Sequence, residues 1–221
     1  LKCIGRAGAG TNNIPVEFAT SNGIVVFNTP GANSNAVKEL VICGMILASR
    51  GIIQGNTYTK SLSNETSESI NTSIESQKKN FKGNELKGKT LGIIGFGNVG
   101  VRLSNLVKGF DMKILVCSKS LETRKSEYPH VENASFDDLV SKSDILTFHC
   151  KATADGRPML TKDHLKKMKP TAYIINAARG NIVDEKDLSD ALNEGLISGA
   201  AVDVFSKEPA KENVLFNNPK V

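Results

Sequence analysis

The stretch TLGIIGFGNVGV at residues 90–101 decides the fold of this chain. An apolar run ends in a glycine-rich turn, after which apolar side chains return at helical spacing. This order of strand, turn and helix is typical of the phosphate-binding turn of a dinucleotide fold. In such a turn Gly95 permits the tight bend, Gly97 lets backbone amides approach a pyrophosphate, and Gly100 lets the helix pack closely on the strand.

A glycine-rich turn can also be purely structural, because many strand–turn–helix units bind nothing. Here the apolar strand before the turn and the apolar stripe of the helix after it supply the context that the motif requires. We therefore expect the helix N-terminus to face the phosphates of a dinucleotide. The residues expected to contact the dinucleotide at this turn are Gly95, Gly97, Asn98, Val99 and Gly100.

The length of 221 residues allows one large α/β domain, or one domain and part of another. The chain begins with Leu1 in what reads as a strand, so we expect an internal fragment that lacks sequence at both ends. No apolar run reaches the roughly 18 residues that span a bilayer, and no secretory signal is recognised. We expect a soluble, cytoplasmic protein that does not act on a membrane.

The cysteines and the charge argue against a metal site and a nucleic-acid surface. The four cysteines lie in apolar segments without CxxC spacing, which favours reduced, packed thiols. The formal net charge is +5, but the lysines are dispersed and the aromatic residues are few, so we expect no stacking platform for nucleic acid. A modest positive field also suits an anionic small molecule.

The first 31 residues read as the remnant of a separate domain. Residues 1–31 hold two short extended segments, at 2–4 and 24–27, each followed by a loop rich in Gly, Asn or Pro. Residues 32–221 are assigned to a nucleotide-binding domain. This division predicts that the two parts meet near residue 31.

A helix is expected at 34–53, followed by a polar connecting arm at 54–86. Ten of the sixteen residues 61–76 are Ser, Thr or Asn, which predicts an exposed arm or loop. The apolar face of the helix is interpreted as core packing. That face consists of Val37, Leu40, Val41, Gly44, Met45, Leu47 and Ala48.

After residue 89 the pattern alternates regularly between strands and helices. This alternation predicts right-handed crossovers and a doubly wound, Rossmann-type parallel sheet of the α/β class. The expected strands are 90–95, 113–117, 144–149, 172–176 and 198–204, and the expected helices are 98–109, 136–141, 161–168 and 184–193.

Several motifs together make the chain resemble the D-2-hydroxyacid dehydrogenase family. They are GRAGAG at 5–10, FNTPGAN at 27–33, the turn at 90–101, the segment 176–185, and DVFSKEP at 203–209. The resemblance covers nearly the whole chain. It implies a Rossmann-type cofactor domain at the centre of a homodimer, with residues 1–31 as the remnant of a flavodoxin-like substrate domain.

The resemblance assigns roles to residues that follow the strands. Arg179 matches the family arginine that holds the substrate carboxylate and polarises the C2 oxygen, a task that suits a planar fork of donors, although a structural ion pair is the alternative. Glu208 matches the carboxylate that orients the catalytic histidine and favours its protonated form, whereas a plain solvated glutamate is the alternative. The cofactor is expected to pass Cys150, Ala177, Ala178, Arg179 and Asp203.

None of the three histidines fits the acid/base role. His130 lies in a loop, His164 lies on a polar helix among lysines, and His149 lies where the family has a non-catalytic histidine. We expect the catalytic histidine a few residues beyond Val221. Loss of a general acid/base costs ~10²–10⁴ in rate, so the sequence as given is expected to bind better than it turns over.

The likeness is to the members of the family that act on 3-phosphoglycerate. Arg6, Ala7 and Gly8 resemble their substrate loop, in which backbone amides hold a carboxylate and the guanidinium holds the phosphate. A surface arginine is the alternative. The implied reaction is hydride transfer between NAD(P) and C2 of 3-phosphoglycerate or 3-phosphohydroxypyruvate, the first step of serine biosynthesis. The alternatives are a glyoxylate or hydroxypyruvate reductase, or a nucleotide-sensing corepressor that binds partners.

The chain departs from the family where the second strand of the sheet ends. NAD enzymes place Asp or Glu there to bind the adenosine ribose, whereas this chain has Ser118 and Lys119. Glu122, the nearest carboxylate, lies four residues past the strand. We therefore expect NADP to be accepted as well as NAD. Lys151 replaces a proline that is usual in the family, and no physical reason explains it.

Overall fold

A six-stranded parallel sheet forms the centre of the molecule, with the strand order β5-β4-β3-β6-β7-β8. The computed structural model describes residues 1–11 and 13–221. The strands are β3 (Thr90–Ile94), β4 (Lys113–Cys117), β5 (Glu132–Asn133), β6 (Ile145–Phe148), β7 (Tyr173–Asn176) and β8 (Gly199–Val202). The chain winds outward from β3 in one direction and then from β6 in the other. This order confirms the predicted Rossmann-type fold.

The register brings the carboxyl ends of the strands to one level. Ile94 is paired with Cys117 on one side and with Phe148 on the other, and Asn176 is paired with Phe148 and Val202. Residues that follow these positions therefore lie along a single edge of the sheet. Ligands of doubly wound sheets bind at this edge, where the strand order reverses between β3 and β6.

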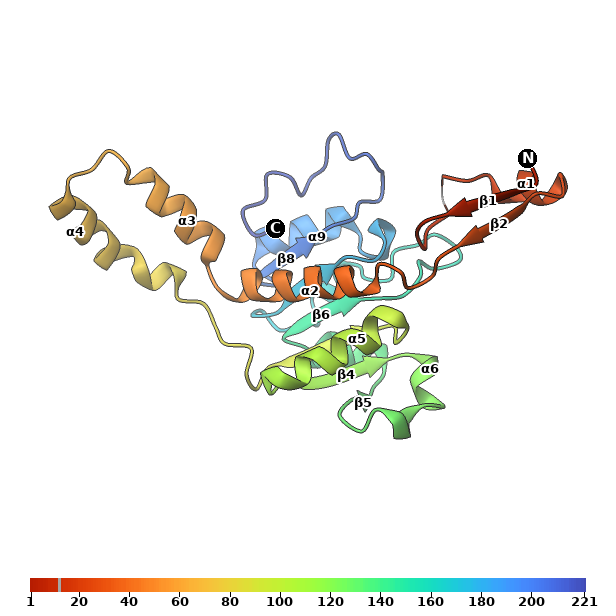
Figure 1. Ribbon diagram of the computed structural model, residues 1–221. Coiled ribbons are helices and arrows are strands. Elements are labelled where there is room, and N and C mark those ends of the chain that lie inside the picture. Colours follow the sequence, from red (N-terminus) through yellow and green to blue (C-terminus); the bar gives the residue numbers. More distant parts are fainter. Residues whose placement is uncertain (12) are drawn as a thin grey trace.

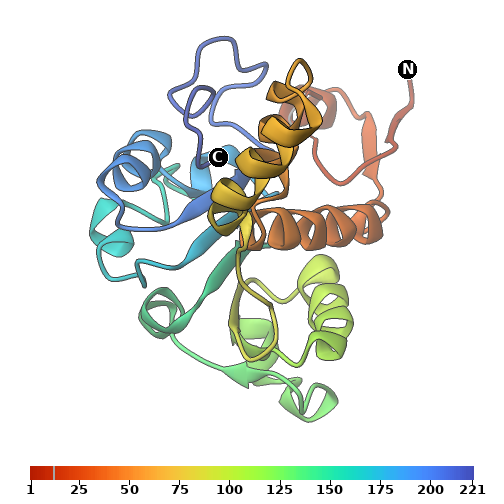
Figure 2. The ribbon, with the colours of Figure 1, turned by 90° about the vertical axis from the view of Figure 1, so that its left-hand side faces the viewer.

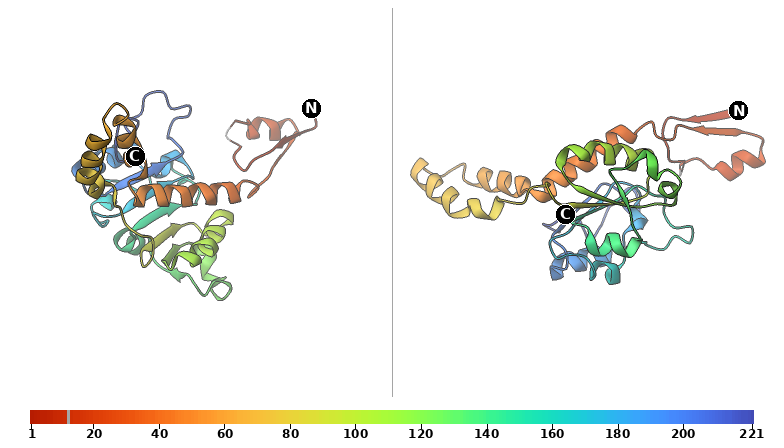
Figure 3. Two further views of the ribbon diagram at one scale, coloured as in Figure 1. Left: turned by 60° about the vertical axis from the view of Figure 1, so that its left-hand side comes forward. Right: turned by 90° about the horizontal axis from the view of Figure 1, so that it is seen from below.

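Helices cover both faces of the sheet (Figure 3, right). One face is covered by α2 (Ser34–Ser49) and α5 (Asn98–Val107), which lie side by side (Figure 2). The other face is covered by α7 (Phe136–Lys142), α8 (Lys162–Leu165) and α9 (Glu185–Glu194). Each face has its own apolar cluster, so the sheet is buried on both sides.

Helix α2 is shorter than predicted, and one residue of its predicted core face is exposed. Val41 and Met45 are fully buried against the sheet, as the apolar pattern predicted. The helix ends at Ser49 because Arg50 is extended. Leu40, which was placed on the core face, is 43% exposed.

A second sheet lies at the N-terminal end of α2 (Figure 1). It consists of the parallel strands β1 (Cys3–Arg6) and β2 (Val25–Asn28), joined by α1 (Val16–Ser21). The sequence predicted both strands to within two residues but not the helix. Phe18 and Phe27 leave most of their surface exposed on this small unit.

The polar arm is a pair of helices that extends from the other end of α2 (Figure 1). It contains α3 (Ile52–Ser61) and α4 (Ser67–Gln77), followed by a 3₁₀ turn at Lys78–Phe81. The predicted exposed arm is therefore present, and its backbone is helical rather than a loop. Tyr58 stacks on Phe81 at 5.4 Å between ring centres and donates a hydrogen bond to Ser73 O at 3.1 Å, and these contacts tie the two helices together.

Short elements complete the structure. They are α6 (Lys119–Glu122) and the 3₁₀ turns Lys108–Phe110, Lys125–Glu127 and Gly180–Ile182. Across the described residues, the structure has no helix both long and apolar enough to cross a membrane.

Candidate functional site

Two glycines of the phosphate-binding turn are required by the protein's own packing. Gly95 has φ +92°, and a Cβ there would lie 2.6 Å from the carbonyl oxygen of His149. A Cβ on Gly100 would lie 2.4 Å from the carbonyl oxygen of Gly95. Gly95 N also donates to Cys117 O at 3.0 Å. The turn is thereby fixed between the ends of β3, β4 and β6.

Gly97 is different, because a Cβ built on it meets no protein atom of the described residues within 4 Å. Its backbone is extended, with φ −93° and ψ −150°, and it precedes the first residue of α5. The missing side chain leaves open space in front of the N-terminus of a ten-residue helix. The unpaired amides at such an end attract anions, so this space fits the pyrophosphate of a dinucleotide.

The next two residues of the turn lie on the surface of α5. The side chain of Asn98 packs against Gly31, where a Cβ would lie 2.5 Å from Asn98 Nδ2. Gly31 has φ +84°, so the connection between β2 and α2 bends over the start of α5. Val99 is half-buried. Their backbone amides belong to the same open helix end.

The end of β4 carries a pair of hydroxyl groups. Ser118 Oγ and Ser120 Oγ lie 2.9 Å apart, and Ser120 Oγ donates to Phe96 O at 3.2 Å. Lys119, between them, is exposed at the first position of α6. Sequence reasoning missed Ser120, which ties this segment to the phosphate-binding turn. Two serines and a lysine therefore lie beside Gly95, where dinucleotide folds hold the adenosine ribose.

The first two residues after β6, His149 and Cys150, are uncharged at neutral pH. Burial lowers the pKa of His149 to about 4, and its Nε2 lies 3.2 Å from Thr147 Oγ1. Burial also raises the pKa of the Cys150 thiol. That His149 is not the acid/base stays a prediction from the sequence. Burial, with Lys108 and Lys125 nearby, lowers the pKa of His130 as well.

A buried amide fixes the turn that carries Arg179. Asn176 is 1% exposed at the end of β7; its Oδ1 accepts a hydrogen bond from Ala178 N at 3.2 Å, and its Nδ2 donates to Arg179 O at 2.9 Å. Ala177 lies within this loop and is half-buried. The Arg179 side chain is exposed, and its Nη1 donates to Ala178 O at 2.6 Å. The role of Asn176 was not predicted, although its place directly after an apolar run is a usable signal.

Arg179 and Glu208 lie in one open cleft of about 520 Å³. The cleft is lined by Asn13, Arg179, Gly180, Asn181, Phe205, Ser206 and Glu208. A Cβ on Gly180 would lie 1.8 Å from the carbonyl carbon of Phe205, so the arginine turn is packed directly on the loop after β8. Glu208 Oε1 accepts a hydrogen bond from Phe205 N at 3.1 Å. Asp203 starts this loop and donates its amide to Asn176 O at 3.0 Å.

The predicted substrate loop lies in the N-terminal unit. Arg6 Nε donates to Gly10 O at 3.1 Å, which folds the guanidinium over Gly8. Gly8 N donates to Arg6 O at 2.9 Å, so this amide is already engaged rather than free for a carboxylate. Ala7 lies between them and is exposed. Asn13, from the same connection, is the residue of this unit that lines the Arg179 cleft.

Comparison with known proteins identifies the family. Residues 43–221 match the model of the D-isomer specific 2-hydroxyacid dehydrogenase, NAD binding domain. The chain belongs to the D-2-hydroxyacid dehydrogenase family. The resemblance seen in the sequence is confirmed, and the turn described above is that of an NAD-binding domain.

Relatives within the family carry two different names. The chain is 41% identical over 216 residues to a D-3-phosphoglycerate dehydrogenase of Methanocaldococcus jannaschii, with 97% of this chain and 39% of the relative covered. It is 38% identical over 216 residues to a glyoxylate reductase of Thermococcus litoralis, with 98% of this chain and 64% of the relative covered. The chain thus spans less than two thirds of either relative.

A solved structure supports the same placement. The glyoxylate reductase from Paecilomyes thermophila matches all of this chain and 63% of its own, with a TM-score of 0.78 and 31% identity. Among the described residues of this family member, no group of His, Cys, Asp and Glu could hold a metal ion.

Proposed function

We propose that this chain is part of an NAD(P)-dependent dehydrogenase that interconverts 3-phosphoglycerate and 3-phosphohydroxypyruvate, the first step of serine biosynthesis. The observation that carries the proposal is a cleft lined by both Arg179 and Glu208, at the sheet edge that also carries the open phosphate-binding turn. A bound nicotinamide would supply or accept the hydride at substrate C2. Arg179 would bind the carboxylate and polarise the C2 oxygen.

The carboxylate of Glu208 has a separate task in this proposal. It would orient and stabilise the protonated form of a histidine that moves the proton. None of the described histidines lines the cleft with Arg179 and Glu208. In this proposal the acid/base is therefore not one of the histidines of the described residues.

Arg6 supports a phosphorylated substrate. It stands on the loop of the N-terminal unit that also supplies Asn13 to the cleft, and its guanidinium is fixed by Gly10 O. A charge-assisted contact from such a group is worth about 1.5–3 kcal/mol. We assign residues 1–31 to the substrate-binding domain and the arm at 54–86 to the cofactor domain. The phosphorylated hydroxy acid is the proposed small-molecule partner.

The serines and lysine at the end of β4 support the use of NADP as well as NAD. Ser118 and Lys119 replace the acidic residue that would bind the 2′-hydroxyl and repel a 2′-phosphate. Lys119 is exposed, so its contribution to phosphate binding is reduced by solvent. The proposal also places the enzyme in the cytoplasm as a homodimer formed through its cofactor domain.

Glyoxylate reduction is the second candidate function. It is favoured by the relative of that name at 38% identity.

The two functions can be separated by steady-state kinetics of the whole protein. The wild type is expected to prefer 3-phosphohydroxypyruvate over glyoxylate, and Arg6→Ala is expected to lower kcat/KM for the phosphorylated substrate roughly tenfold to a hundredfold. Use of the short acid should change little. Arg179→Ala should abolish turnover of both acids and leave dinucleotide affinity largely intact. Equal losses on both acids in Arg6→Ala would remove the phosphate assignment, and a wild type that prefers glyoxylate would establish the alternative.

A further inference from the structure

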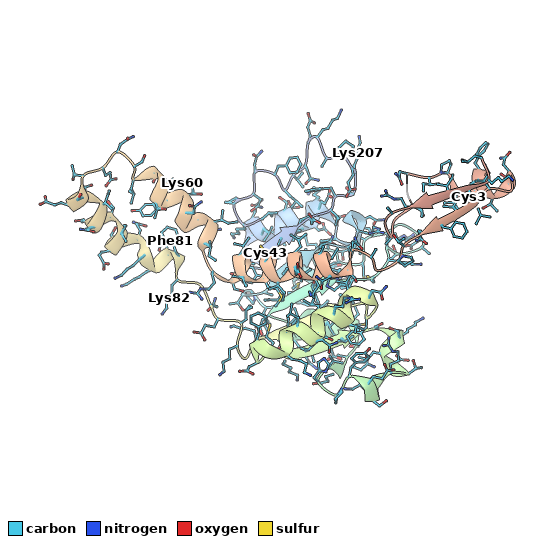
Figure 4. The ribbon with its side chains drawn as sticks, in the orientation of Figure 1. Cys3, Cys43, Lys60, Phe81, Lys82 and Lys207 are labelled. Atoms are coloured by element: carbon cyan, nitrogen blue, oxygen red, sulfur yellow. The ribbon has the colours of Figure 1, made fainter. Side chains whose placement is uncertain are left out.

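The loop that carries Glu208 follows β8 and extends outward above β8 and α9 before it returns to the core (Figure 1). Lys207 marks its outer part in Figure 4. The loop is anchored at one end by Asp203 N, which donates to Asn176 O. It is anchored at the other end by Leu215, which is 2% exposed in the apolar core. Between these anchors most of the loop is exposed, so its middle can be fixed only by contacts from another part of the chain.

Glu185, the first residue of α9, holds the middle of this loop. Its Oε1 accepts a hydrogen bond from Ser206 N at 2.7 Å, and its Oε2 accepts bonds from Ser206 Oγ and Asn213 Nδ2, each at 2.9 Å. Both carboxylate oxygens are therefore used, by three donors from two places in the loop. Bonds to an ionised acceptor are short and strong compared with neutral ones.

These contacts are more than the usual preference for acids at the start of a helix. The N-cap of α9 is already made by Asp184, whose side chain accepts from Asp187 N at 2.9 Å. An acidic side chain in the first turn is favoured by the helix dipole without any specific partner. Glu185 instead points its two oxygens at Ser206 and Asn213.

The hydrogen bonds that Glu185 accepts from Ser206 and Asn213 connect the start of α9 to the candidate site. Ser206 follows Phe205, whose amide donates to Glu208 Oε1 at 3.1 Å. Gly180, next to Arg179, is packed on the backbone of Phe205 and Ser206. A shift of Ser206 would therefore change the position of Glu208 relative to Arg179.

We propose that Glu185 is a positioning residue, which holds Glu208 and Arg179 in the relative position that proton transfer requires. The inference rests on the proposed dehydrogenase function. Displacement of a catalytic group by about 1 Å can cost up to 10²-fold in rate. Loss of these hydrogen bonds should therefore act on turnover through Glu208 and leave the phosphate-binding turn, which follows β3, unchanged.

The test compares Glu185→Gln with Glu194→Gln in the whole protein. Glu194 lies at the other end of α9 and pairs with Lys162, so the control removes the same charge from the same helix. We expect Glu185→Gln to lower kcat/KM roughly tenfold to a hundredfold. Its pH profile should shift in the same direction as that of Glu208→Gln, and NADH affinity should stay within about twofold of the wild type. The control should match the wild type.

A double variant and an exchange measurement decide the remaining outcomes. Because Glu185 acts through Glu208, adding Glu185→Gln to Glu208→Gln should cause little further loss. Losses that multiply, or an unshifted pH profile, would overturn the positioning role. Hydrogen exchange of 203–213 should quicken in Glu185→Gln and stay unchanged in Glu194→Gln. If the wild-type protein neither oxidises a 2-hydroxy acid nor reduces a 2-oxo acid, the proposed function fails. Unchanged exchange in Glu185→Gln would separately overturn the role of Glu185 in holding the loop.

Discussion

At the scale of single residues, the buried amide of Asn176 fixes the backbone from which Arg179 projects. It accepts from one backbone amide and donates to one carbonyl of the same turn. Leaving such groups unpaired costs about 1–3 kcal/mol, so the turn has a strong reason to keep this shape. The long, exposed side chain of Arg179 therefore starts from a rigid position, which lowers the entropy lost when its guanidinium binds a carboxylate.

Cofactor choice is the first prediction at this scale, and it concerns Ser118. The wild type is expected to bind NADPH at least as tightly as NADH, with a preference nearer tenfold than a thousandfold because Lys119 is exposed. Ser118→Asp places a carboxylate where it accepts from the ribose and repels a 2′-phosphate, so it should reverse the preference. Fluorescence titration of both cofactors measures it, with Ser63→Asp on the arm as a control. A wild type that clearly prefers NADH, or an unchanged ratio in Ser118→Asp, would contradict the assignment.

The enclosed imidazole of His149 predicts a dependence of stability on pH. Its pKa is about 4 in the folded protein against an ordinary value of 6.5, so the unfolded chain binds more protons between these values. The free energy of unfolding should therefore fall as the pH falls from 6.5 toward 4, by roughly 2 kcal/mol at pH 5 from this group. His149→Gln cannot titrate, so urea unfolding at pH 7 and pH 5 should show a smaller drop than in the wild type. Equal drops would mean that His149 does not contribute.

The residues that follow the strands could be predicted, and the residues that hold them could not. Parallel strands end at one edge, so their order alone brings Gly95, Ser118 and Arg179 together. Ser120 and Glu185 act through hydrogen bonds to Phe96, Ser206 and Asn213, which are 21 to 28 residues distant in the sequence. No local pattern marks such partners, because a polar residue on a helix or loop is usually solvated.

At the scale of elements, two glycines of the phosphate-binding turn have different tasks. Gly95 is required for folding, and Gly97 is required for binding the dinucleotide. Gly95→Ala would place a Cβ against the backbone of His149 at φ +92°, which should cost at least about 1–3 kcal/mol and lower the Tm. Gly97→Ala meets no described protein atom and should fold like the wild type. It should nevertheless weaken NADH binding at least tenfold, because the methyl group enters the space of the pyrophosphate. Thermal unfolding and NADH titration measure the two effects.

Each glycine variant serves as the control for the other. A Gly97→Ala protein that binds NADH normally would show that the dinucleotide does not approach this turn. A Gly97→Ala protein with a strongly lowered Tm would show that the open space is not the reason for the glycine.

The arm shows why an element can be missed when its composition is read without its neighbours. Serine, threonine and asparagine favour turns and caps over helix interiors, so residues 61–76 predicted an exposed arm or loop. In the structure Thr66 caps α4 by accepting from Ser69 N, and Phe81 packs across Gly51 and Gly55. The helices therefore depend on a contact between segments about thirty residues apart. Neither segment, read alone, predicts this contact.

At the scale of the whole molecule, α2 connects three parts: the N-terminal unit, the cofactor domain and the arm (Figure 1). Its inner face is buried in the core through Val41 and Met45. Its outer face carries Leu40 and Ile46, which are 43% and 37% exposed, with Cys43 between them (Figure 4). Ile52 and Ile53, at the start of α3, are 49% and 57% exposed. Exposed apolar side chains that gather on one face can mark an interaction surface, and the proposed homodimer would cover those of α2.

The proposed homodimer predicts what happens when charged side chains are introduced on this outer face. Leu40→Glu combined with Ile46→Glu should give a folded monomer, because an unpaired carboxylate buried in an interface is costly whereas the inner face of α2 is untouched. Leu106→Glu is the matched control, since Leu106 is 41% exposed and lies on α5 rather than on α2. Sedimentation of the whole protein at micromolar concentration should show dimers for the wild type and for the control. A double variant that remains dimeric with an unchanged sedimentation coefficient would place the contact between subunits elsewhere. A monomeric wild type would exclude the homodimer.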